Sequence, residues 1–402
     1  MNPSLFVLLF VTFIDFMGMG LIYPIFSVLL FDPSLTILPS NTTQEMRGFW
    51  LGLLFALMPL IQLFSSPIWG TISDNKGRKN PLLISLSITM LGHVISIFGV
   101  FFSSISILLF SRVILGIGCG NISIVQASIA DLSTPEEKAK NFSLYSMAIG
   151  AAFTLGPFIG GFFSTWGFSL PFFFASLITA INLILAKGIL KETQHSRSEK
   201  KLNCALGLKN LKKAFHIKNI RAILLCAFLT GFGWSFFMDF APIYLIQHFQ
   251  FSSAKIGIFY GAIGGFYALS AGILIRPLLS RLKPETLFFV GCFFAALCIF
   301  TVPFYPSPVW LFPFVIVFSY SDTLITPAAT TIVSNSASAD IQGEALGVLG
   351  SVNTASYALS ALLAGTFIGL NASLSMWVGG SSFMIAALIL LGVFRKQLIK
   401  LY

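Results

Sequence analysis

Three aspartates lie inside apolar segments of this sequence, where a negative charge is costly. Asp15 lies in FIDFMGMGLIYP, within an apolar stretch from about residue 3 to residue 31, while Asp239 and Asp322 lie in GWSFFMDFAP and FSYSDTLITP. A helix over the first stretch is longer than the roughly 30 Å hydrocarbon core of a bilayer. A carboxylate at that depth costs at least ~2.5 kcal/mol, and such residues usually mark an ion or proton pathway. The three aspartates are therefore candidates to carry a proton or to hold a cation.

Two further ionisable side chains lie within apolar segments. Arg112 is about six residues from the predicted outer end of its segment, and His93 is of a type that titrates near neutral pH. With Asp15, Asp239 and Asp322 they form the set of candidate proton-coupling residues. Structural alternatives remain open for each: hydrogen bonds between helices for the acids, worth roughly 0.6–2 kcal/mol per contact, a snorkelling arginine, and a packed, hydrogen-bonded histidine.

The composition identifies the kind of protein that carries these residues. Of the 402 residues, 56% are hydrophobic and 9% are charged, and the mean hydropathy is +0.89. Soluble domains carry about 25% charged residues, so the sequence predicts an all-α polytopic membrane protein. We expect twelve transmembrane helices, at about 4–31, 48–72, 81–102, 106–130, 141–163, 169–190, 220–247, 253–275, 284–304, 308–333, 342–367 and 373–394.

The basic residues indicate topology and not a nucleic-acid partner, although the net charge is +10. With the N-terminus inside, one side of the membrane receives nearly all of the lysines and arginines between the segments, and the other keeps Arg47 and Lys255. This asymmetry is the positive-inside rule. It predicts a multi-pass protein of the cell's inner (plasma) membrane with both termini in the cytoplasm.

Neither metal nor enzyme chemistry is indicated by the sequence. Its five cysteines are scattered and show no CxxC spacing, so no disulfide framework, metal site or other cofactor is predicted. Walker-A, HExxH and GxSxG patterns are absent from the sequence, which therefore gives no support to ATP hydrolysis or hydrolase activity.

One long polar stretch divides the sequence into two halves. We expect an N-terminal six-helix bundle over residues 1–190, a cytoplasmic linker over 191–219 and a C-terminal six-helix bundle over 220–402. The halves echo each other weakly, since Asp15 precedes Tyr23-Pro24 in the first span and Asp239 precedes Pro242 in the seventh. Two such repeats are typical of transporters that bind their substrate near the membrane midplane.

The first predicted cytoplasmic loop, GTISDNKGRKNP, resembles the signature loop of the major facilitator superfamily. The residues that carry the resemblance are Gly70, Asp74, Gly77, Arg78 and Lys79. In that family the loop acid meets the start of span eleven, here residues 342–347, and the loop arginine meets the acid that ends span four, here Asp131. The resemblance thus implies a cytoplasmic gate made of the loop residues and Asp131.

Span five contains GAAFTLGPFIGG, which resembles the motif that marks proton-driven antiporters within the superfamily. Its characteristic residues are Gly150, Gly156, Pro157, Gly160 and Gly161. Gly156 and Gly160 form a GxxxG face, and glycines 257, 261 and 265 of span eight have the same spacing and are the expected partner. Close packing without a meaning for transport is the alternative.

Together these motifs resemble the twelve-span drug:proton antiporters, and most of all the tetracycline/proton antiporters. FIDFMGMGLIYPI is similar to their first span and IADLSTPEEKAKNFS to the end of their fourth. The sequence departs from them in span three, where their acid is replaced by His93, and in span nine, where residues 287–303 contain no carboxylate.

The resemblance also implies a cavity lined by spans one, four, seven and ten. The ionisable residues Asp15, Arg112, Asp239 and Asp322 fall on these four spans. The candidate substrate-binding residues are the three acids and their polar or aromatic neighbours Asn121, Gln126, Trp234, Tyr244 and Tyr320.

The function that the resemblance implies is export of a small amphipathic or cationic organic compound in exchange for protons. The expected partners are that solute, protons and the lipid bilayer, and the protein is expected to work as a monomer. An importer or facilitator of a metabolite or siderophore on the same fold is one alternative. A membrane sensor that transports nothing is another.

Overall fold

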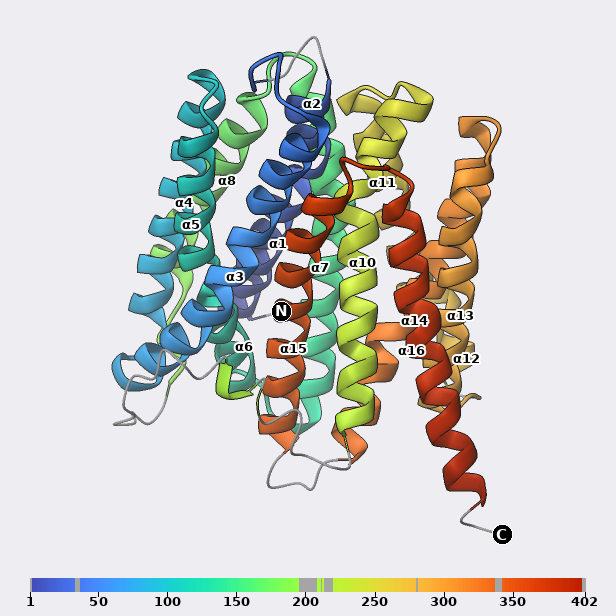
Figure 1. Ribbon diagram of the computed structural model, residues 1–402. Helices are drawn as coiled ribbons and strands as arrows, with labels where there is room; N and C mark the ends of the chain where they lie inside the picture. Colours follow the sequence, from blue (N-terminus) through green and yellow to red (C-terminus); the bar gives the residue numbers. More distant parts are fainter. Residues whose placement is uncertain are drawn as a thin grey trace. The chain divides into compact units, whose positions relative to one another are not determined.

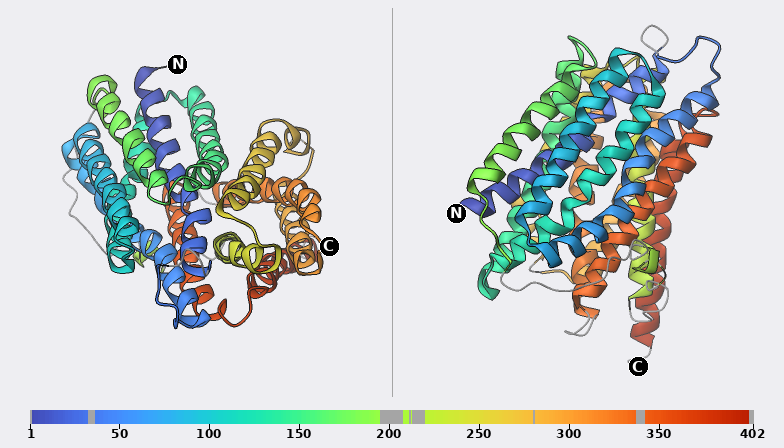
Figure 2. Two further views of the ribbon diagram at one scale, coloured as in Figure 1. Left: turned by 90° about the horizontal axis from the view of Figure 1, so that it is seen from above. Right: turned by 90° about the vertical axis from the view of Figure 1, so that its left-hand side faces the viewer.

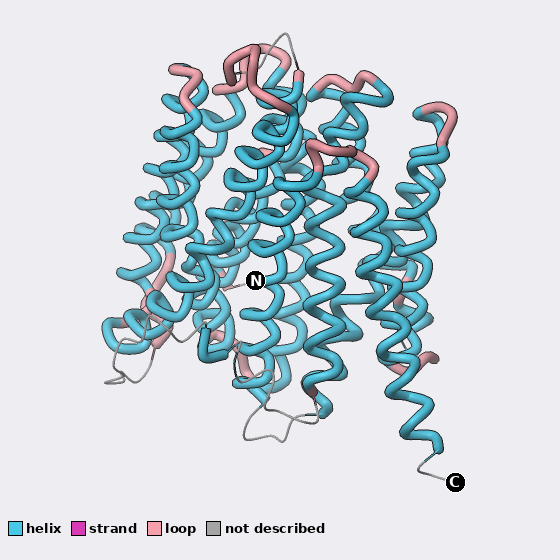
Figure 3. Tube along the Cα trace, viewed as in Figure 1, coloured by secondary structure: helices cyan, strands magenta, loops and turns pink. Residues whose placement is uncertain are grey.

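The computed structural model describes residues 2–32, 37–194, 208–210, 212, 220–279, 281–336 and 342–399. Within these ranges every regular element is a helix (Figure 1, Figure 3), which confirms the predicted all-α class. The elements up to residue 189 are α1 (Pro3–Leu21), α2 (Tyr23–Phe31), α3 (Gln44–Lys76), α4 (Lys79–Phe101), α5 (Ile105–Gly118), the 3-10 turn η1 (Cys119–Asn121), α6 (Ile122–Asp131), α7 (Pro135–Ser164) and α8 (Leu170–Ile189).

The second part of the chain is built in the same way. Its elements are α10 (Arg221–Phe249), α11 (Ser253–Leu269), the π-helical turn η2 (Ser270–Leu274), α12 (Arg276–Leu279), α13 (Pro284–Thr301), the 3-10 turns η3 (Val302–Phe304) and η4 (Pro308–Trp310), α14 (Leu311–Ser336), α15 (Gln342–Phe367) and α16 (Leu374–Ile399).

The described residues contain twelve helical segments that are long and apolar enough to cross a membrane. By the bounds of their helices, ten of the twelve begin and end within four residues of the predicted segments, but α7 begins earlier and α16 ends later. The early start of α7 has a local cause, because Pro135 occupies its first turn and the Thr134 hydroxyl accepts a hydrogen bond from the Glu137 backbone N–H. A predicted apolar segment does not include such a polar first turn. Most of the predicted linker, at 195–207, 211 and 213–219, lies outside the described residues.

By contacts between Cα atoms the chain forms two compact units. Unit 1 contains residues 1–42, 53–207 and 252–261, and unit 2 contains residues 43–52, 208–251 and 262–402. In unit 1, α1 lies beside α7 and α8, and α4 lies beside α5 and α8 (Figure 2). In unit 2, α10 packs on α15 and α16, while α13 packs on α14 and α16.

Short segments of α3 and α11 leave their own half of the sequence because glycines allow very close packing. A Cβ atom on Gly52 of α3 would lie 2.6 Å from the Ala361 carbonyl oxygen in α15, which places residues 43–52 in unit 2. A Cβ atom on Gly161 of α7 would lie 2.8 Å from the Cα atom of Gly257 in α11, which places residues 252–261 in unit 1. The predicted boundaries at residues 190 and 220 stay a prediction.

The first span is interrupted just beyond its aspartate. α1 ends at Leu21 and α2 begins at Tyr23, with Pro24 in its first turn. Proline has no backbone N–H and a fixed φ, so it suits the start of a helix but not its interior. α7 fits closely against this region, since a Cβ atom on Gly156 would lie 2.6 Å from the Met17 carbonyl oxygen.

We predict that Gly156→Ala lowers the thermal stability of the protein, because the added methyl group would force α1 and α7 apart. Overpacking of this kind typically costs about 1–3 kcal/mol. Gly188→Ala is the matched control, since a Cβ atom there would meet no atom within 4 Å and alanine favours the helix. Thermal unfolding in detergent measures both variants, and equal melting temperatures would contradict the close contact.

Candidate functional site

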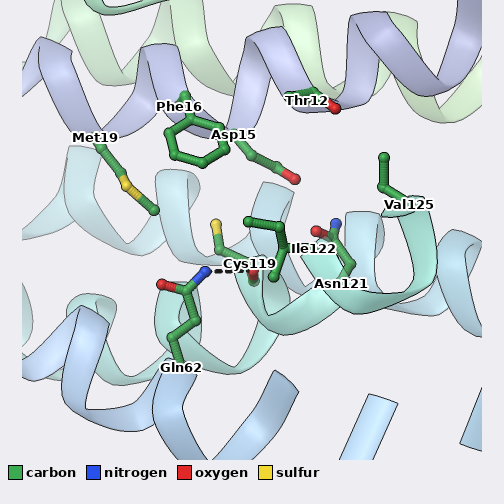
Figure 4. A pocket seen from close by; sticks show the side chains of 9 residues that line it. All are labelled: Thr12, Asp15, Phe16, Met19, Gln62, Cys119, Asn121, Ile122 and Val125. Carbon is green, nitrogen blue, oxygen red and sulfur yellow. Dashed lines mark hydrogen bonds between the residues drawn. The ribbon is translucent and has the colours of Figure 1, made fainter. Parts of the chain in front are cut away.

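Asp15 lies at a small pocket inside unit 1 that has room for about one water molecule (Figure 4). The side chains around it come from span one, from α3 and from the middle of span four. They are Thr12, Asp15, Phe16 and Met19 of α1, Gln62 of α3, Cys119 and Asn121 of η1, and Ile122 and Val125 of α6.

The pocket exists because span four is not a continuous α-helix. Between α5 and α6 the backbone tightens into the 3-10 turn η1, and such a turn within a helix often marks a functional position. Three side chains on one face of α3 donate hydrogen bonds to backbone carbonyl groups at and just before this turn. Gln62 Nε2 donates to the Cys119 oxygen at 2.9 Å, Ser65 Oγ to the Gly116 oxygen at 2.7 Å and Trp69 Nε1 to the Ile117 oxygen at 2.7 Å.

The polar atoms in the pocket are only partly satisfied. Asp15 is 7% exposed and Asn121 is fully buried. The two side chains point toward one another, and Asn121 is within hydrogen-bonding range of the carboxyl. Nevertheless Oδ1 of Asp15 and both amide atoms of Asn121 lack a well-formed hydrogen bond. Within the described part of the chain no basic side chain pairs with Asp15, so the pocket carries one uncompensated carboxyl.

Arg112 lies elsewhere in the interior of unit 1. Its side chain is 1% exposed, which excludes the snorkelling alternative. Nη2 donates to the hydroxyl of Ser96 at 2.5 Å and to that of Ser111 at 3.3 Å, and the guanidinium carbon lies 5.1 Å from the ring centre of Phe26 and 5.7 Å from that of Phe172. No described carboxylate forms an ion pair with it. Hydroxyl groups and aromatic faces thus surround this buried cation.

His93 lies between Arg112 and the first span. It is near enough to Arg112 for the two charges to interact, and a Cβ atom on Gly18 would lie 3.2 Å from its Cε1 atom. The ring is buried, but Nδ1 has no hydrogen-bond partner. The structural alternative for this residue is therefore met only in part, since the ring is packed without being fully hydrogen-bonded.

The other two acids lie together in unit 2. Asp239 of α10 accepts a hydrogen bond from Ser235 Oγ at 2.5 Å, and Asp322 of α14 lies within hydrogen-bonding range of Trp234. Tyr357 of α15 is close enough to interact with both carboxyls, and its ring centre is 5.9 Å from that of Trp234. Tyr357 could not be found from the sequence, because a lone tyrosine among many aromatic residues gives no signal.

Three of the predicted lining residues lie outside both groups. Gln126 is exposed and donates to the Tyr145 hydroxyl at 3.2 Å. Tyr244 packs its ring on His248, with 5.0 Å between the ring centres, and its hydroxyl is 3.4 Å from the Pro303 carbonyl oxygen. Tyr320 is half-buried on α14. Their proposed contact with substrate stays a prediction.

The predicted gate residues meet in unit 1. Arg78 binds Asp74 at 2.5 Å and Asp131 at 3.0 Å, and it also donates to Ser73 Oγ at 2.8 Å. Burial opposes the charge of Arg78, but the hydrogen bonds to the two carboxylates raise its pKa above the usual value. The expected contact of Asp74 with residues 342–347 stays a prediction, and the side chains of residues 342–344 lie outside the described part of the structure.

The rest of the loop motif positions this arginine. Lys79 Nζ donates to the Lys187 carbonyl oxygen at 2.9 Å. Gly77 has a φ of +95°, a left-handed conformation that favours glycine. Gly70 faces Ser123 of α6 at ordinary contact distance, since a Cβ atom there would lie 3.4 Å from Ser123 Oγ.

Glu192 joins the predicted gate residues from the predicted linker, and its role could not be found from the sequence. Its carboxylate accepts hydrogen bonds from the backbone N–H of Arg78 at 2.8 Å and of Lys79 at 3.3 Å, at the N-terminus of α4. Partial burial opposes its charge, but four backbone N–H groups lower the pKa of Glu192 below its ordinary value. An acid three residues beyond a span gave no signal, because its partner lies more than 100 residues earlier.

The span-five motif contacts two different helices. Gly156 and Gly160 face α1, at Met17 and Leu21, so their expected pairing with span eight is wrong. Gly257 and Gly261 of α11 meet the other side of α7, at Pro157, Phe158 and Gly161. The reason is helical geometry, since neighbouring positions such as 160 and 161 face about 100° apart. The Gly150 carbonyl accepts a hydrogen bond from Thr154 Oγ1 at 2.9 Å.

We predict that Glu192→Gln reduces the pH dependence of stability in acid. A lowered pKa means that Glu192 stabilises the fold above its ordinary value of 4.5, and this contribution is lost as the pH falls through its folded value. The loss should be no more than about 0.5–2 kcal/mol, the usual size of a helix cap, because the group is partly exposed. Melting temperatures at pH 6 and pH 3.5 measure it. Wild type should lose more than the variant, and equal losses would count against the cap.

Comparison with known proteins places this geometry in a family. The sequence model described as "Major Facilitator Superfamily" matches residues 8–361. Quinolone resistance protein NorA of Staphylococcus aureus (strain COL) is 30% identical over 375 residues, which cover 92% of this chain and 88% of that protein. Multidrug resistance protein 2 of Bacillus subtilis (strain 168) is 31% identical over 253 residues, which cover 61% of this chain and 58% of that protein.

Solved structures agree at the level of the fold. The human organic anion transporter MFSD10 (TETRAN) matches with a TM-score of 0.72 and 20% identity, over 96% of this chain and 99% of that one. A D-xylose-proton symporter matches with a TM-score of 0.73 and 16% identity, over 95% and 96% of the two chains. Identities this low establish the shared architecture alone.

Proposed function

The chain belongs to the Major Facilitator Superfamily and is a membrane transporter, and we propose that it is a proton-coupled antiporter that exports a small amphipathic or cationic organic compound. The names of its bacterial relatives, which refer to quinolone and multidrug resistance, support efflux. The observation that carries the proposal is Asp15, a buried carboxyl without a basic partner among the described residues.

Exchange follows from the chemistry of such a carboxyl. An ionised carboxylate away from water is costly unless it is paired, so it binds either a proton or the cationic part of a solute. It cannot hold both at once, and the arrival of one therefore releases the other. If the site opens alternately to the two sides of the membrane, this competition couples proton entry to solute exit.

The remaining ionisable residues have roles in the same proposal. Asp239 and Asp322, linked through Tyr357 and Trp234, share proton binding or select the substrate. Arg112 and His93 adjust the electrostatic potential in unit 1 as the proton moves. Arg78, between Asp74 and Asp131, closes the cytoplasmic side of the pathway.

The driving force is adequate for export. One charge that crosses 100 mV releases about 2.3 kcal/mol, and a tenfold concentration ratio requires about 1.4 kcal/mol. One proton, with a modest pH gradient in addition, thus sustains a gradient of ~10²-fold for a solute without net charge. Exchange of one proton for a monovalent cation moves no net charge, so the pH gradient alone drives it. We place the protein in the cell's inner (plasma) membrane, as a monomer with both termini in the cytoplasm.

We predict that Asp15→Asn abolishes proton exchange, because asparagine cannot bind and release a proton. Wild type, Asp15→Asn and the control Asp32→Asn, an acid at the end of α2, would be placed in liposomes loaded with a pH dye. Cationic drugs, siderophores and amino acids would then be added under an imposed proton gradient. A compound that moves protons with wild type and Asp32→Asn, but not with Asp15→Asn, supports the antiporter.

The same experiment separates the alternatives. If labelled solutes cross equally with wild type and Asp15→Asn and no compound moves protons, the protein is a facilitator, and growth on a sole nutrient would identify its solute. If nothing crosses with any of the proteins, transport itself is wrong for these compounds.

We predict that Asp74→Asn lowers turnover several-fold and leaves substrate affinity nearly unchanged. Asp74 binds Arg78 at the gate and does not line the Asp15 pocket, so its loss should affect opening and closing but not binding. Initial transport rates and equilibrium binding of the same labelled compound measure the two quantities. A large loss of affinity with normal turnover would contradict the gate.

A further inference from the structure

The polar groups of the Asp15 pocket are mostly hydrogen-bond acceptors. Asp15 offers carboxyl oxygens and Asn121 offers its amide oxygen. The Thr12 hydroxyl donates its proton to the Leu8 carbonyl oxygen at 3.0 Å, so its lone pairs stay available. Gln62 uses its amide nitrogen on the Cys119 carbonyl oxygen and keeps its own oxygen for other donors. A ligand for this pocket should therefore bring positive charge and N–H groups.

We propose that this pocket binds the charged head of the transported compound and selects a head with N–H donors, a primary or secondary ammonium, over a quaternary one. The inference rests on the proposed function and names its substrate class. Asn121 is the residue that distinguishes the two kinds of head, because its amide is fully buried and neither of its polar atoms has a well-formed hydrogen bond.

Unsatisfied groups are the physical source of the selectivity. A buried polar atom that finds no hydrogen bond loses its interaction with water without a replacement. An ammonium head donates to Asp15 and Asn121 together. A trimethylammonium head donates to neither, so it leaves Asn121 unsatisfied in the complex. A site built to hydrogen-bond a ligand rejects an analogue that lacks the donor for this reason.

Size acts in the same direction as hydrogen bonding. The pocket has room for about one water molecule, and an ammonium group is close to that size, whereas a trimethylammonium group is several times larger. The hydrogen bonds from Gln62, Ser65 and Trp69 fix the backbone on one side of the pocket, so it cannot widen cheaply. Phe16 and Met19 supply apolar surface for the carbon skeleton that carries the head.

The test compares a matched pair of probes on purified protein in detergent. N-dansyl-1,6-diaminohexane carries a primary ammonium, and its N,N,N-trimethyl analogue carries a quaternary head on the same skeleton. We expect wild type to bind the primary amine about tenfold or more tightly, a ratio equivalent to roughly 1.4 kcal/mol. Asn121→Ala should reduce this ratio to about two- or threefold, while Asn182→Ala should keep it.

Asn182 is a strict control for Asn121. It is fully buried on α8 with both amide atoms unpartnered, and it lies outside the pocket. Any general effect of removing a buried amide from unit 1 therefore appears in both variants. A loss of selectivity confined to Asn121→Ala is the expected result.

A second measurement uses wild type alone, in case Asn121→Ala fails to fold. A ligand that binds the folded protein raises its melting temperature, so thermal unfolding in detergent is followed at rising concentrations of each probe. The primary amine should raise the melting temperature at concentrations where the quaternary analogue does not. Equal shifts with the two probes would overturn the inference.

The outcomes separate this inference from the function on which it rests. If both probes bind equally, or the quaternary probe binds better, the selectivity is wrong, while export of either probe from liposomes leaves the antiporter standing. If neither probe binds nor moves protons in liposomes, the ammonium head and the export of organic cations are both wrong.

Discussion

Backbone carbonyl groups inside a bilayer must find hydrogen-bond donors within the protein, because no water is available to them. In unit 1 this requirement is met by three α3 side chains that donate to the carbonyls of residues 116, 117 and 119. They hold span four where it tightens into η1, and η1 places Asn121 opposite Asp15. The pocket therefore depends on residues of a helix that contributes only Gln62 to its lining.

The three intramembrane acids have different surroundings, although their sequence contexts are alike. Asp15 faces an amide without a well-formed hydrogen bond, Asp239 accepts one from Ser235, and Asp322 lies within hydrogen-bonding range of Trp234. A carboxyl that already has a donor loses that bond when it changes partner, and one without a donor does not. This difference makes Asp15 the acid best suited to exchange ligands and gives the pair in unit 2 a more fixed arrangement.

Much of the fold could be predicted from the sequence, because apolar length and charge placement act locally along the chain. The acids and Arg112 could be found in the same way, since a polar residue in an apolar segment is conspicuous, whereas the loop motif was found by its resemblance to a family signature. The η1 turn could not, because CGN continues a helical pattern and the donors that stabilise it lie about 50 residues earlier. Glu192 and Tyr357 were missed for a similar reason, as each acts through a partner distant in sequence.

The assignment of residues 43–52 and 252–261 to opposite units has a mechanical consequence. α3 and α11 each begin in one unit and continue into the other, so each helix belongs to both units. Any rotation of one unit against the other must bend these two helices. α3 contains Pro59 and Pro67, and α11 runs into the π-helical turn Ser270–Leu274. Helices bend most easily at prolines and π-turns. Both helices can therefore bend after the point where they pass from one unit to the other.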